Sequence, residues 1–227
     1  MGTNITNTLI LAGCYMALFA LGEGLYHVVK VKAEITRKLV HAGTGLLALL
    51  FPLLLDSHWW VLLLCASFAV ILLCSLRFNG LRSINAIDRR SAGSLAYPAA
   101  VYVCYLSYQY HGHQLIHYYL PVLVLAISDP LAALVGRKWP WAPYRAGRSR
   151  KTALGSLVFF GSALLITIVN WQYLYGTGLS AGNLPAFATI ALLATVAEAV
   201  SPNGYDNLSV PFAVTLGILF ISSWITV

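Results

Sequence analysis

Eight apolar segments, each close to the length that a bilayer requires, divide this chain of 227 residues. They cover residues 8–29, 39–55, 59–76, 92–108, 115–135, 153–171, 184–200 and 210–225. A helix needs about 20 apolar residues to cross the hydrocarbon core. Because lipid offers no hydrogen-bond partners, a segment in the bilayer must satisfy its own backbone groups. We therefore predict an all-α fold, a polytopic transmembrane bundle of about eight spans.

The composition excludes a water-soluble domain. Hydrophobic residues make up 59% of the chain and charged residues 9%, and the mean hydropathy is +0.76, whereas a soluble domain is roughly 25% charged. Since no polar linker or internal repeat divides the chain, we expect one integral membrane domain over residues 1–227. Residues 8–29 lack a preceding basic segment and are too long for the core of a secretory signal. We expect them to form a peripheral first span.

The positions of Lys and Arg orient the predicted bundle. When the eight segments are threaded back and forth, all 14 Lys and Arg residues fall on one side, in the connections at residues 30–38, 77–90 and 137–151. Cytoplasmic loops of membrane proteins carry an excess of these residues. We therefore expect the basic connections to be cytoplasmic and both termini to be non-cytoplasmic. The net charge of +7 then reflects topology, and we expect no binding to nucleic acid.

The second basic connection has an amphipathic pattern. Phe78, Leu81, Ile84 and Ile87 recur at near-helical spacing between basic residues. This pattern is compatible with a short helix lying on anionic headgroups. An ordinary topology anchor explains it equally well.

Three of the seven acidic residues gather at one depth. Asp129 lies toward the cytoplasmic end of the fifth segment, Glu198 near that of the seventh, and Asp206 in the turn that follows. Ionisable residues inside a membrane are costly, so they favour a functional role. Carboxylates beside basic residues suit Mg²⁺ and a polyphosphate together, because hard oxygen ligands hold the metal while cations hold the phosphates. The pattern predicts a site at the cytoplasmic surface.

Two short segments sharpen this prediction. In RKLVH, Arg37 and His41 are one helical turn apart and Lys38 lies beside them, which suits phosphate binding but is also typical of a membrane anchor. In SDPLAALVGRKWP, Asp129 and Gly136 share a helical face, and the small residue permits a close approach. An Asp in an otherwise apolar span favours catalysis or metal binding.

Two further segments follow in the chain. In RKTALGS, Lys151, Thr152 and Ser156 lie at the start of the sixth span, where Thr152 can cap the helix and free N–H groups favour an anion. The spacing of a P-loop is absent, and a capped helix after a basic loop is the alternative. After the seventh span, Asp206 and Asn207 can both coordinate Mg²⁺, although Asp-Asn is common in turns.

Taken in order, RKLVH, SDPLAALVGR, RKTALGS and the segment from Glu198 to Asp206-Asn207 resemble the phytol kinase and dolichol kinase family. The resemblance covers about residues 37–211, which we take as the catalytic core. It implies a polytopic enzyme that transfers the γ-phosphate of CTP, with Mg²⁺ as cofactor, to a membrane lipid alcohol. The alcohol would be of the phytol, polyprenol or dolichol type, or diacylglycerol. The family is distantly similar to the membrane cytidylyltransferases that make CDP-lipids.

The resemblance also implies roles for individual residues. The catalytic residues would be Arg37, Lys38, His41, Asp129 and Glu198. The nucleotide would be bound by Gly136, Arg137, Lys151, Thr152, Gly155 and Ser156. The metal would be bound by Asp129, Asp206 and Asn207. One departure from the family pattern is Ser128-Asp129-Pro130, where many relatives have Gly before the Asp and a residue other than Pro after it.

Two other functions are compatible with the same residues. A cytidylyltransferase would place CMP on a phosphorylated lipid and release pyrophosphate. A transporter for an anionic solute would use the buried charges as a pathway. Against a transporter, the chain has no internal repeat, and its polar groups gather on one side without continuing to the other.

Overall fold

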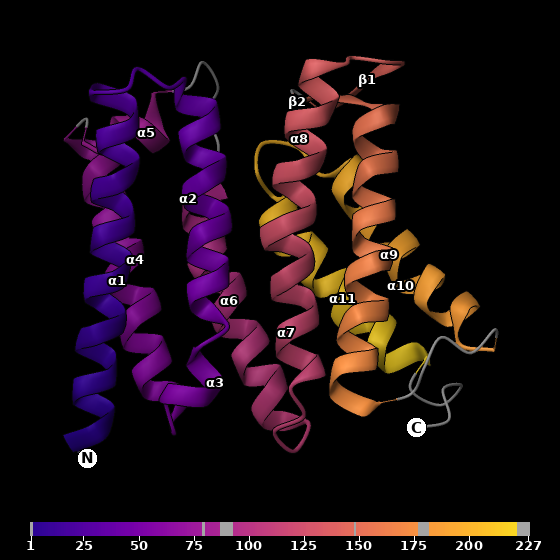
Figure 1. Ribbon diagram of the computed structural model, residues 1–227, viewed down its shortest axis with the longest axis horizontal. Helices are drawn as coiled ribbons and strands as arrows, with labels where there is room; N and C mark the ends of the chain where they lie inside the picture. Colours follow the sequence, from indigo (N-terminus) through magenta and orange to yellow (C-terminus); the bar gives the residue numbers. More distant parts are fainter. Residues whose placement is uncertain (1, 79, 87–92, 148, 177–181, 222–227) are drawn as a thin grey trace.

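The computed structural model describes residues 2–78, 80–86, 93–147, 149–176 and 182–221, and it consists of long helices that run nearly side by side (Figure 1). The all-α fold that the sequence predicts is confirmed. The elements are α1 (Gly2–His27), α2 (Ala33–Ala48), α3 (Phe51–Leu54), α4 (His58–Arg77), α5 (Arg82–Asn85), α6 (Gly93–Tyr110), α7 (Ile116–Leu123), the π-helix η1 (Val124–Ser128), α8 (Asp129–Lys138), β1 (Pro143–Ala146), β2 (Ser149–Thr152), α9 (Ala153–Tyr175), α10 (Leu184–Val200) and α11 (Asp206–Ile221).

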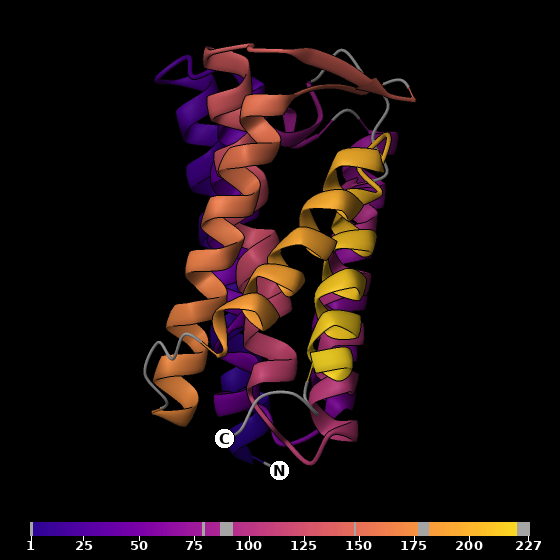
Figure 2. The same ribbon diagram turned by 90° about the vertical axis from the view of Figure 1, so that its right-hand side faces the viewer.

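Helices occupy all eight predicted segments, but they differ in length. The helical stretches long and apolar enough to cross a membrane are Gly2–His27, Ala33–Leu54, His58–Arg77, Ile116–Lys138 and Ala153–Tyr175. The two last helices, α10 and α11, have 17 and 16 residues, and α10 runs obliquely to its neighbours (Figure 2). Residues 222–225 of the eighth predicted segment lie outside the described residues.

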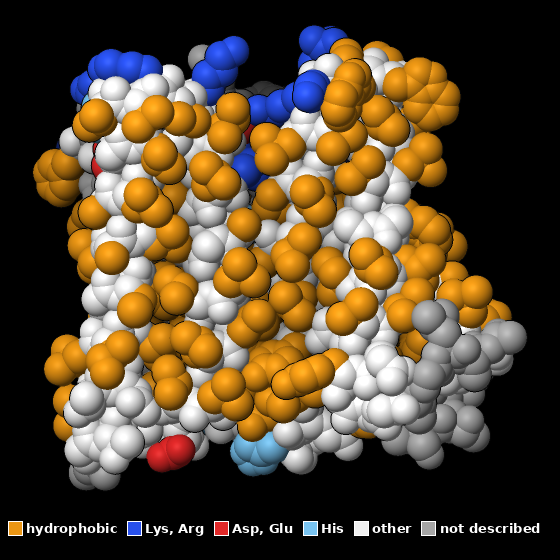
Figure 3. All heavy atoms as spheres, in the orientation of Figure 1, with side chains coloured by type: hydrophobic (Ala, Val, Ile, Leu, Met, Phe, Trp, Pro, Cys, Tyr) orange, Lys and Arg blue, Asp and Glu red, His pale blue; other side chains and the backbone are white. Residues whose placement is uncertain are grey.

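Basic side chains gather at one end of the bundle. In Figure 3 the blue Lys and Arg surface lies at the top, above a wide band of hydrophobic side chains. The same end carries the connection from α1 to α2, the helix α5 and the β-hairpin, whereas the N-terminus and the end of α11 lie at the opposite end (Figure 1). The arrangement of the described helices therefore agrees with the charge asymmetry in the sequence.

Buried tyrosines satisfy carbonyl groups where helices end. The Tyr118 hydroxyl donates to the carbonyl of Ala48, the last residue of α2, at 2.8 Å. The Tyr105 hydroxyl donates to the carbonyl of Leu55, directly after α3, at 2.7 Å. The last carbonyls of a helix have no partner within the helix, and an unpaired polar group is costly in an apolar interior. The tyrosines therefore allow α2 and α3 to end inside the bundle.

A π-helical turn interrupts the helix that carries Asp129. The turn covers Val124–Ser128, directly before α8, and Pro130 follows Asp129. Proline has no backbone N–H, and its ring clashes with the carbonyl four residues earlier, which here belongs to Ala126. Single π turns inside α-helices accommodate such a disturbance. The Ser-Asp-Pro sequence thus accounts for the irregular helix beside the carboxylate.

The connection between α8 and α9 forms a β-hairpin, which the sequence analysis did not predict. Strands β1 and β2 pair antiparallel, with Ala146 opposite Ser149 at the turn, and Gly147 has a positive φ of 56°. The Ser149 hydroxyl accepts a hydrogen bond from the Asn203 N–H at 2.9 Å. Because Asn203 belongs to the turn between α10 and α11, the hairpin reaches from α8 and α9 to the next helix pair, as Figure 2 shows.

Helices α8 and α9 approach most closely at two glycines. A Cβ on Gly136 would lie 2.5 Å from Thr152 Oγ1 and 3.3 Å from Gly155 Cα, and a Cβ on Gly155 would lie 3.0 Å from the Ala132 carbonyl oxygen. Small residues are what permit such close backbone packing between membrane helices. These glycines therefore set the position of the start of α9 relative to α8.

We expect Gly136→Val to lower the free energy of unfolding by about 1–3 kcal/mol, because the new side chain has no space beside Thr152 and Gly155. Thermal unfolding of the purified protein in detergent measures this loss. The control is Gly161→Ala in α9, where a Cβ meets nothing within 4 Å. This variant should be as stable as the parent or more stable, since Ala favours a helix by about 1 kcal/mol over Gly. Equal stability of Gly136→Val and the parent would contradict the packing argument.

Candidate functional site

A buried ion pair joins α2 to α8. Lys38 Nζ lies 2.5 Å from Asp129 Oδ2, and the two side chains are only 8% and 7% exposed. Removing two charges from water is expensive, so such a pair persists only with close geometry and further hydrogen bonds. Both residues come from segments that the sequence analysis selected, and the structure brings them into direct contact.

His41 completes this first cluster. Its Nε2 lies 3.7 Å from Asp129 Oδ2 and 3.2 Å from the carbonyl oxygen of Leu125 in η1. On its other side the ring of Tyr97, from α6, lies 4.4 Å away between centroids, and the Tyr97 hydroxyl donates to the His41 carbonyl at 3.4 Å. The π-helical turn and α6 therefore hold the imidazole beside the carboxylate.

Glu34 joins two arginines above this cluster. Its Oε2 accepts a hydrogen bond from Arg37 Nη2 at 3.2 Å and forms an ion pair with Arg137 Nη1 at 2.8 Å. One carboxylate thus ties α2 to the last turn of α8.

Glu34 was not among the predicted site residues. Its position three residues before Arg37 on one helix could have predicted the contact between these two side chains.

A second cluster lies at the end of the β-hairpin. Lys151 Nζ lies 2.7 Å from Glu198 Oε1 and 3.7 Å from Asp206 Oδ2, and it also donates to the backbone carbonyl of Glu198. The lysine comes from β2, the glutamate from α10 and the aspartate from the first turn of α11. The helix dipole favours a carboxylate at that last position. Three separate elements therefore meet at one ammonium group.

The start of α9 has the cap that its sequence predicts. Thr152 Oγ1 accepts a hydrogen bond from the Gly155 N–H at 3.0 Å. The Ser156 hydroxyl is hydrogen-bonded to the Tyr144 hydroxyl of β1 at 2.7 Å. This cap orients the first turn of α9 beside the second cluster, and the role of these residues in phosphate binding stays a prediction.

Asn207 connects the second cluster to α6. Its side-chain Nδ2 donates to the Gly93 carbonyl at 2.7 Å, and its backbone N–H contacts Asp206 Oδ1 at 3.1 Å. The side chain is 5% exposed. The amide therefore holds the start of α11 against the start of α6, a structural contact that the sequence analysis did not foresee.

The two clusters belong to one region of the molecule. Asp129 begins α8, and α8 packs directly on α9, which begins after Lys151 and Thr152. Within the described ranges, no group of three or more His, Cys, Asp or Glu is placed to hold a metal ion. The binding of Mg²⁺ by Asp129, Asp206 and Asn207 stays a prediction, since in this structure Asp129 contacts Lys38 and the Asn207 amide donates to the Gly93 carbonyl.

A comparison with known proteins identifies the family of the chain. Long apolar helices and charged clusters near one end define a polytopic membrane protein with its polar site toward one surface. The sequence is 31% identical over 208 residues to the phytol kinase of Synechocystis sp.. The aligned region covers 91% of this chain and 88% of that protein. No family model matches the sequence, and no solved structure matches it. The chain belongs to the phytol kinase and dolichol kinase family, and it is an integral membrane protein.

The buried pair gives a stability prediction. We expect Lys38→Met and Asp129→Leu each to lower the free energy of unfolding by about 3–5 kcal/mol, because each leaves one charge buried without its partner. The double variant should recover most of this loss, since an apolar pair replaces the ion pair. Thermal unfolding in detergent of the parent, both single variants and the double variant tests this cycle. Additive losses in the double variant would show that the two residues act independently.

Proposed function

We propose that this protein is a CTP-dependent kinase that transfers the γ-phosphate of CTP to the hydroxyl of a membrane lipid. The acceptor is of the phytol, polyprenol or dolichol type, or diacylglycerol. The observation that carries the proposal is the presence of two largely buried lysine–carboxylate pairs, Lys38 with Asp129 and Lys151 with Glu198, in one apolar bundle. The similarity to a phytol kinase supports a lipid alcohol as acceptor.

The chemistry requires little covalent help from the protein. In phosphoryl transfer the lipid oxygen forms a bond to the γ-phosphorus, the bond to the β-phosphate oxygen breaks, and CDP leaves. Catalysis then depends on positioning and on neutralising charge. In this proposal Arg137, Lys151 and the first turn of α9 bind the phosphates of CTP. Arg37 and Lys38 neutralise charge on the group that is transferred.

The carboxylates have two tasks in the proposal. Asp129, Asp206 and Asn207 hold Mg²⁺, which neutralises charge on the phosphates when it is bound. Either Glu198 or Asp129 accepts the proton of the lipid hydroxyl, and Lys151 or Lys38 stabilises the ionised form of that carboxylate by its contact. Because each carboxylate already contacts a lysine, incoming phosphates compete with the carboxylates for these two ammonium groups.

The site would work at the cytoplasmic membrane surface. In the proposed topology eight helices span the bilayer, the basic end is cytoplasmic and both termini are non-cytoplasmic. The catalytic core covers about residues 37–211. Asp129 lies nine residues before Lys138 on α8. At 1.5 Å per residue, it is roughly 14 Å farther along the helix from the basic end. A lipid alcohol can therefore keep its hydrocarbon chain in the bilayer while its hydroxyl reaches the carboxylate.

Labelled CTP distinguishes the proposed kinase from its alternatives. With purified protein, Mg²⁺ and a panel of lipid alcohols, label in the γ-phosphate should appear on the lipid. A cytidylyltransferase would instead release that label in pyrophosphate and transfer label from the cytidine. A transporter would move an anionic solute across a vesicle without consuming nucleotide, and either of these outcomes would contradict the kinase proposal.

Two variants test the assigned residues. Asp129→Asn and Lys151→Gln should each lower kcat by about 10²-fold or more, the effect expected when a general base or a group stabilising transition-state charge is lost. The control is Asp56→Asn at the opposite end of the bundle, where the Asp56 carboxylate accepts a hydrogen bond from the Asn4 side chain. Its kcat should equal that of the parent. Thermal unfolding of each variant separates lost chemistry from lost structure. If Asp129→Asn turned over like the parent, the central assignment would be wrong.

A further inference from the structure

A basic pocket lies where α1 ends and α2 begins. It is lined by Tyr26, His27, Lys30, Val31, Lys32 and Arg82, and its volume is about 310 Å³. These residues come from the last turn of α1, the connection to α2 and the short helix α5. None of them belongs to the candidate site, so the pocket requires an explanation of its own.

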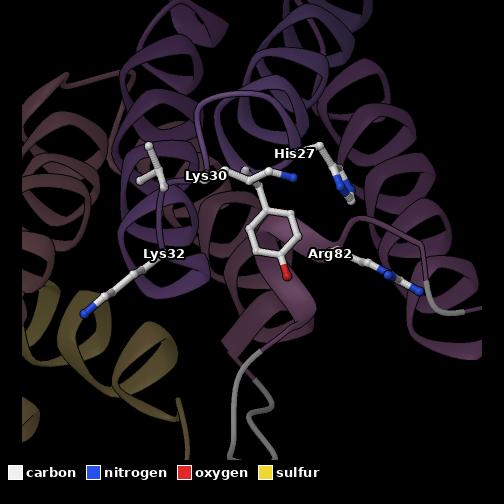
Figure 4. A pocket seen from close by; sticks show the side chains of 6 residues that line it. His27, Lys30, Lys32 and Arg82 are labelled. Carbon is white, nitrogen blue, oxygen red and sulfur yellow. The ribbon is translucent and has the colours of Figure 1, made fainter.

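Three of the lining residues, Lys30, Lys32 and Arg82, carry cations. Lys30, Lys32 and Arg82 are exposed, and among the described residues none of the three forms an ion pair. Figure 4 shows His27 and Arg82 on one side of the pocket, Lys32 on the other, and Lys30 between them. His27 already contacts Glu23 at 3.1 Å. Like charges around one depression repel each other, so an anion bound among them would be favoured.

The framework of the pocket is held by buried contacts. The Ser83 N–H donates to Glu23 Oε1 of α1 at 2.8 Å, and Thr36 Oγ1 of α2 donates to the Ser83 carbonyl at 2.6 Å. Ser83 and Thr36 are fully buried. The short helix α5 is thus tied to both α1 and α2. Arg82 directly precedes Ser83, so these two hydrogen bonds also hold the backbone of Arg82 in place beside the pocket.

Lys30 occupies a backbone position that normally favours glycine. Its φ is 61°, and the next residue, Val31, donates its N–H to the Leu25 carbonyl at 3.0 Å near the end of α1. A side chain in this conformation is disfavoured, and such strain is concentrated at functional positions. Glycine would adopt this conformation without strain.

Apolar side chains beside the cations indicate the source of the anion. Val28, Val29 and Phe78 are 80%, 63% and 78% exposed at the same end of the bundle. Exposed apolar residues next to Lys and Arg are typical of the boundary between the hydrocarbon core and the headgroups. We infer that the pocket binds the phosphate group of an anionic lipid headgroup from the surrounding bilayer. Basic pockets between membrane helices bind such headgroups.

Native mass spectrometry of the full chain tests this inference. Protein purified in micelles of neutral phosphatidylcholine is titrated with phosphatidylglycerol, and the bound lipid is counted. The triple variant Lys30→Gln, Lys32→Gln, Arg82→Gln should bind phosphatidylglycerol about 100-fold more weakly than the parent, a factor of about five for each cation. The matched control removes three exposed cations elsewhere at the basic end, by Lys138→Gln, Arg145→Gln and Arg150→Gln. Its affinity should stay within about threefold of the parent.

The remaining outcomes of the titration would overturn the inference. Equal loss in both triple variants would mean general attraction by positive charge, and no loss in either would mean that the pocket does not bind the lipid. A parallel titration with inorganic phosphate distinguishes the two sources of the anion. If inorganic phosphate bound the parent as tightly as phosphatidylglycerol and displaced it, the ligand would be free phosphate and the lipid assignment would fail.

A single substitution separates binding from folding. Lys30→Gly removes one cation and also relieves the positive φ, so its thermal midpoint should equal or exceed that of the parent. Its affinity for phosphatidylglycerol should nevertheless fall about fivefold. Unchanged affinity would show that Lys30 is no part of the binding site, and a lower midpoint would contradict the strain argument. Neither result depends on kinase activity, so failure here leaves the proposed function intact.

Discussion

The contact between Lys38 and Asp129 is the interaction on which the charged region depends. Each side chain alone would be a buried charge among apolar helices, and only their mutual contact, with His41 at the same oxygen, makes the arrangement tolerable. Because one partner is on α2 and the other on α8, the pair also fixes these two helices relative to each other. The charges therefore serve as structural contacts whether or not they take part in chemistry.

The second cluster also pairs a lysine with carboxylates, but other elements of the fold carry its residues. Lys151 belongs to a β-hairpin rather than a long helix, and it contacts carboxylates on α10 and α11. The hairpin is anchored at its other end, where Ser149 accepts the Asn203 N–H. The helix pair α10 and α11 is thus linked to α8 and α9 through short polar contacts at the basic end. In the first cluster the lysine is held by a helix inside the bundle, and in the second it is held by a surface element.

Much of the fold could be predicted from the sequence because lipid permits few alternatives. A long apolar segment must satisfy its own backbone, so all eight segments are helical, and Thr152 caps α9 because threonine before an apolar run can accept an N–H. Helix starts were predicted less well. Helix α2 begins at Ala33 rather than near residue 39, because the polar turn before the apolar run continues the helix. As a result RKLVH lies within α2, and Lys38 is buried.

Contacts between distant elements could not be predicted. The bridge from Glu34 to Arg137 depends on how α2 packs against α8, and no spacing within either segment encodes it. The β-hairpin was missed because its strands have four residues each and are rich in charged and polar side chains, which resemble an ordinary loop. The contact of Asp129 with Lys38 likewise depends on how α2 packs against α8.

The π-helical turn before Asp129 has a consequence for the direction in which that side chain points. Successive residues of an α-helix are rotated by about 100° around its axis, and η1 holds one residue more per turn than a regular helix would need. Because the π turn already accommodates one extra residue, deleting a single residue from Val124–Ser128 would leave a regular helix with the flanking residues in nearly their present directions. A deletion in a regular part of the same span would instead rotate Asp129 by about 100° relative to the residues before the deletion, and the carboxylate would turn away from α2. The π turn therefore determines where this span can lose a residue and still direct Asp129 toward α2.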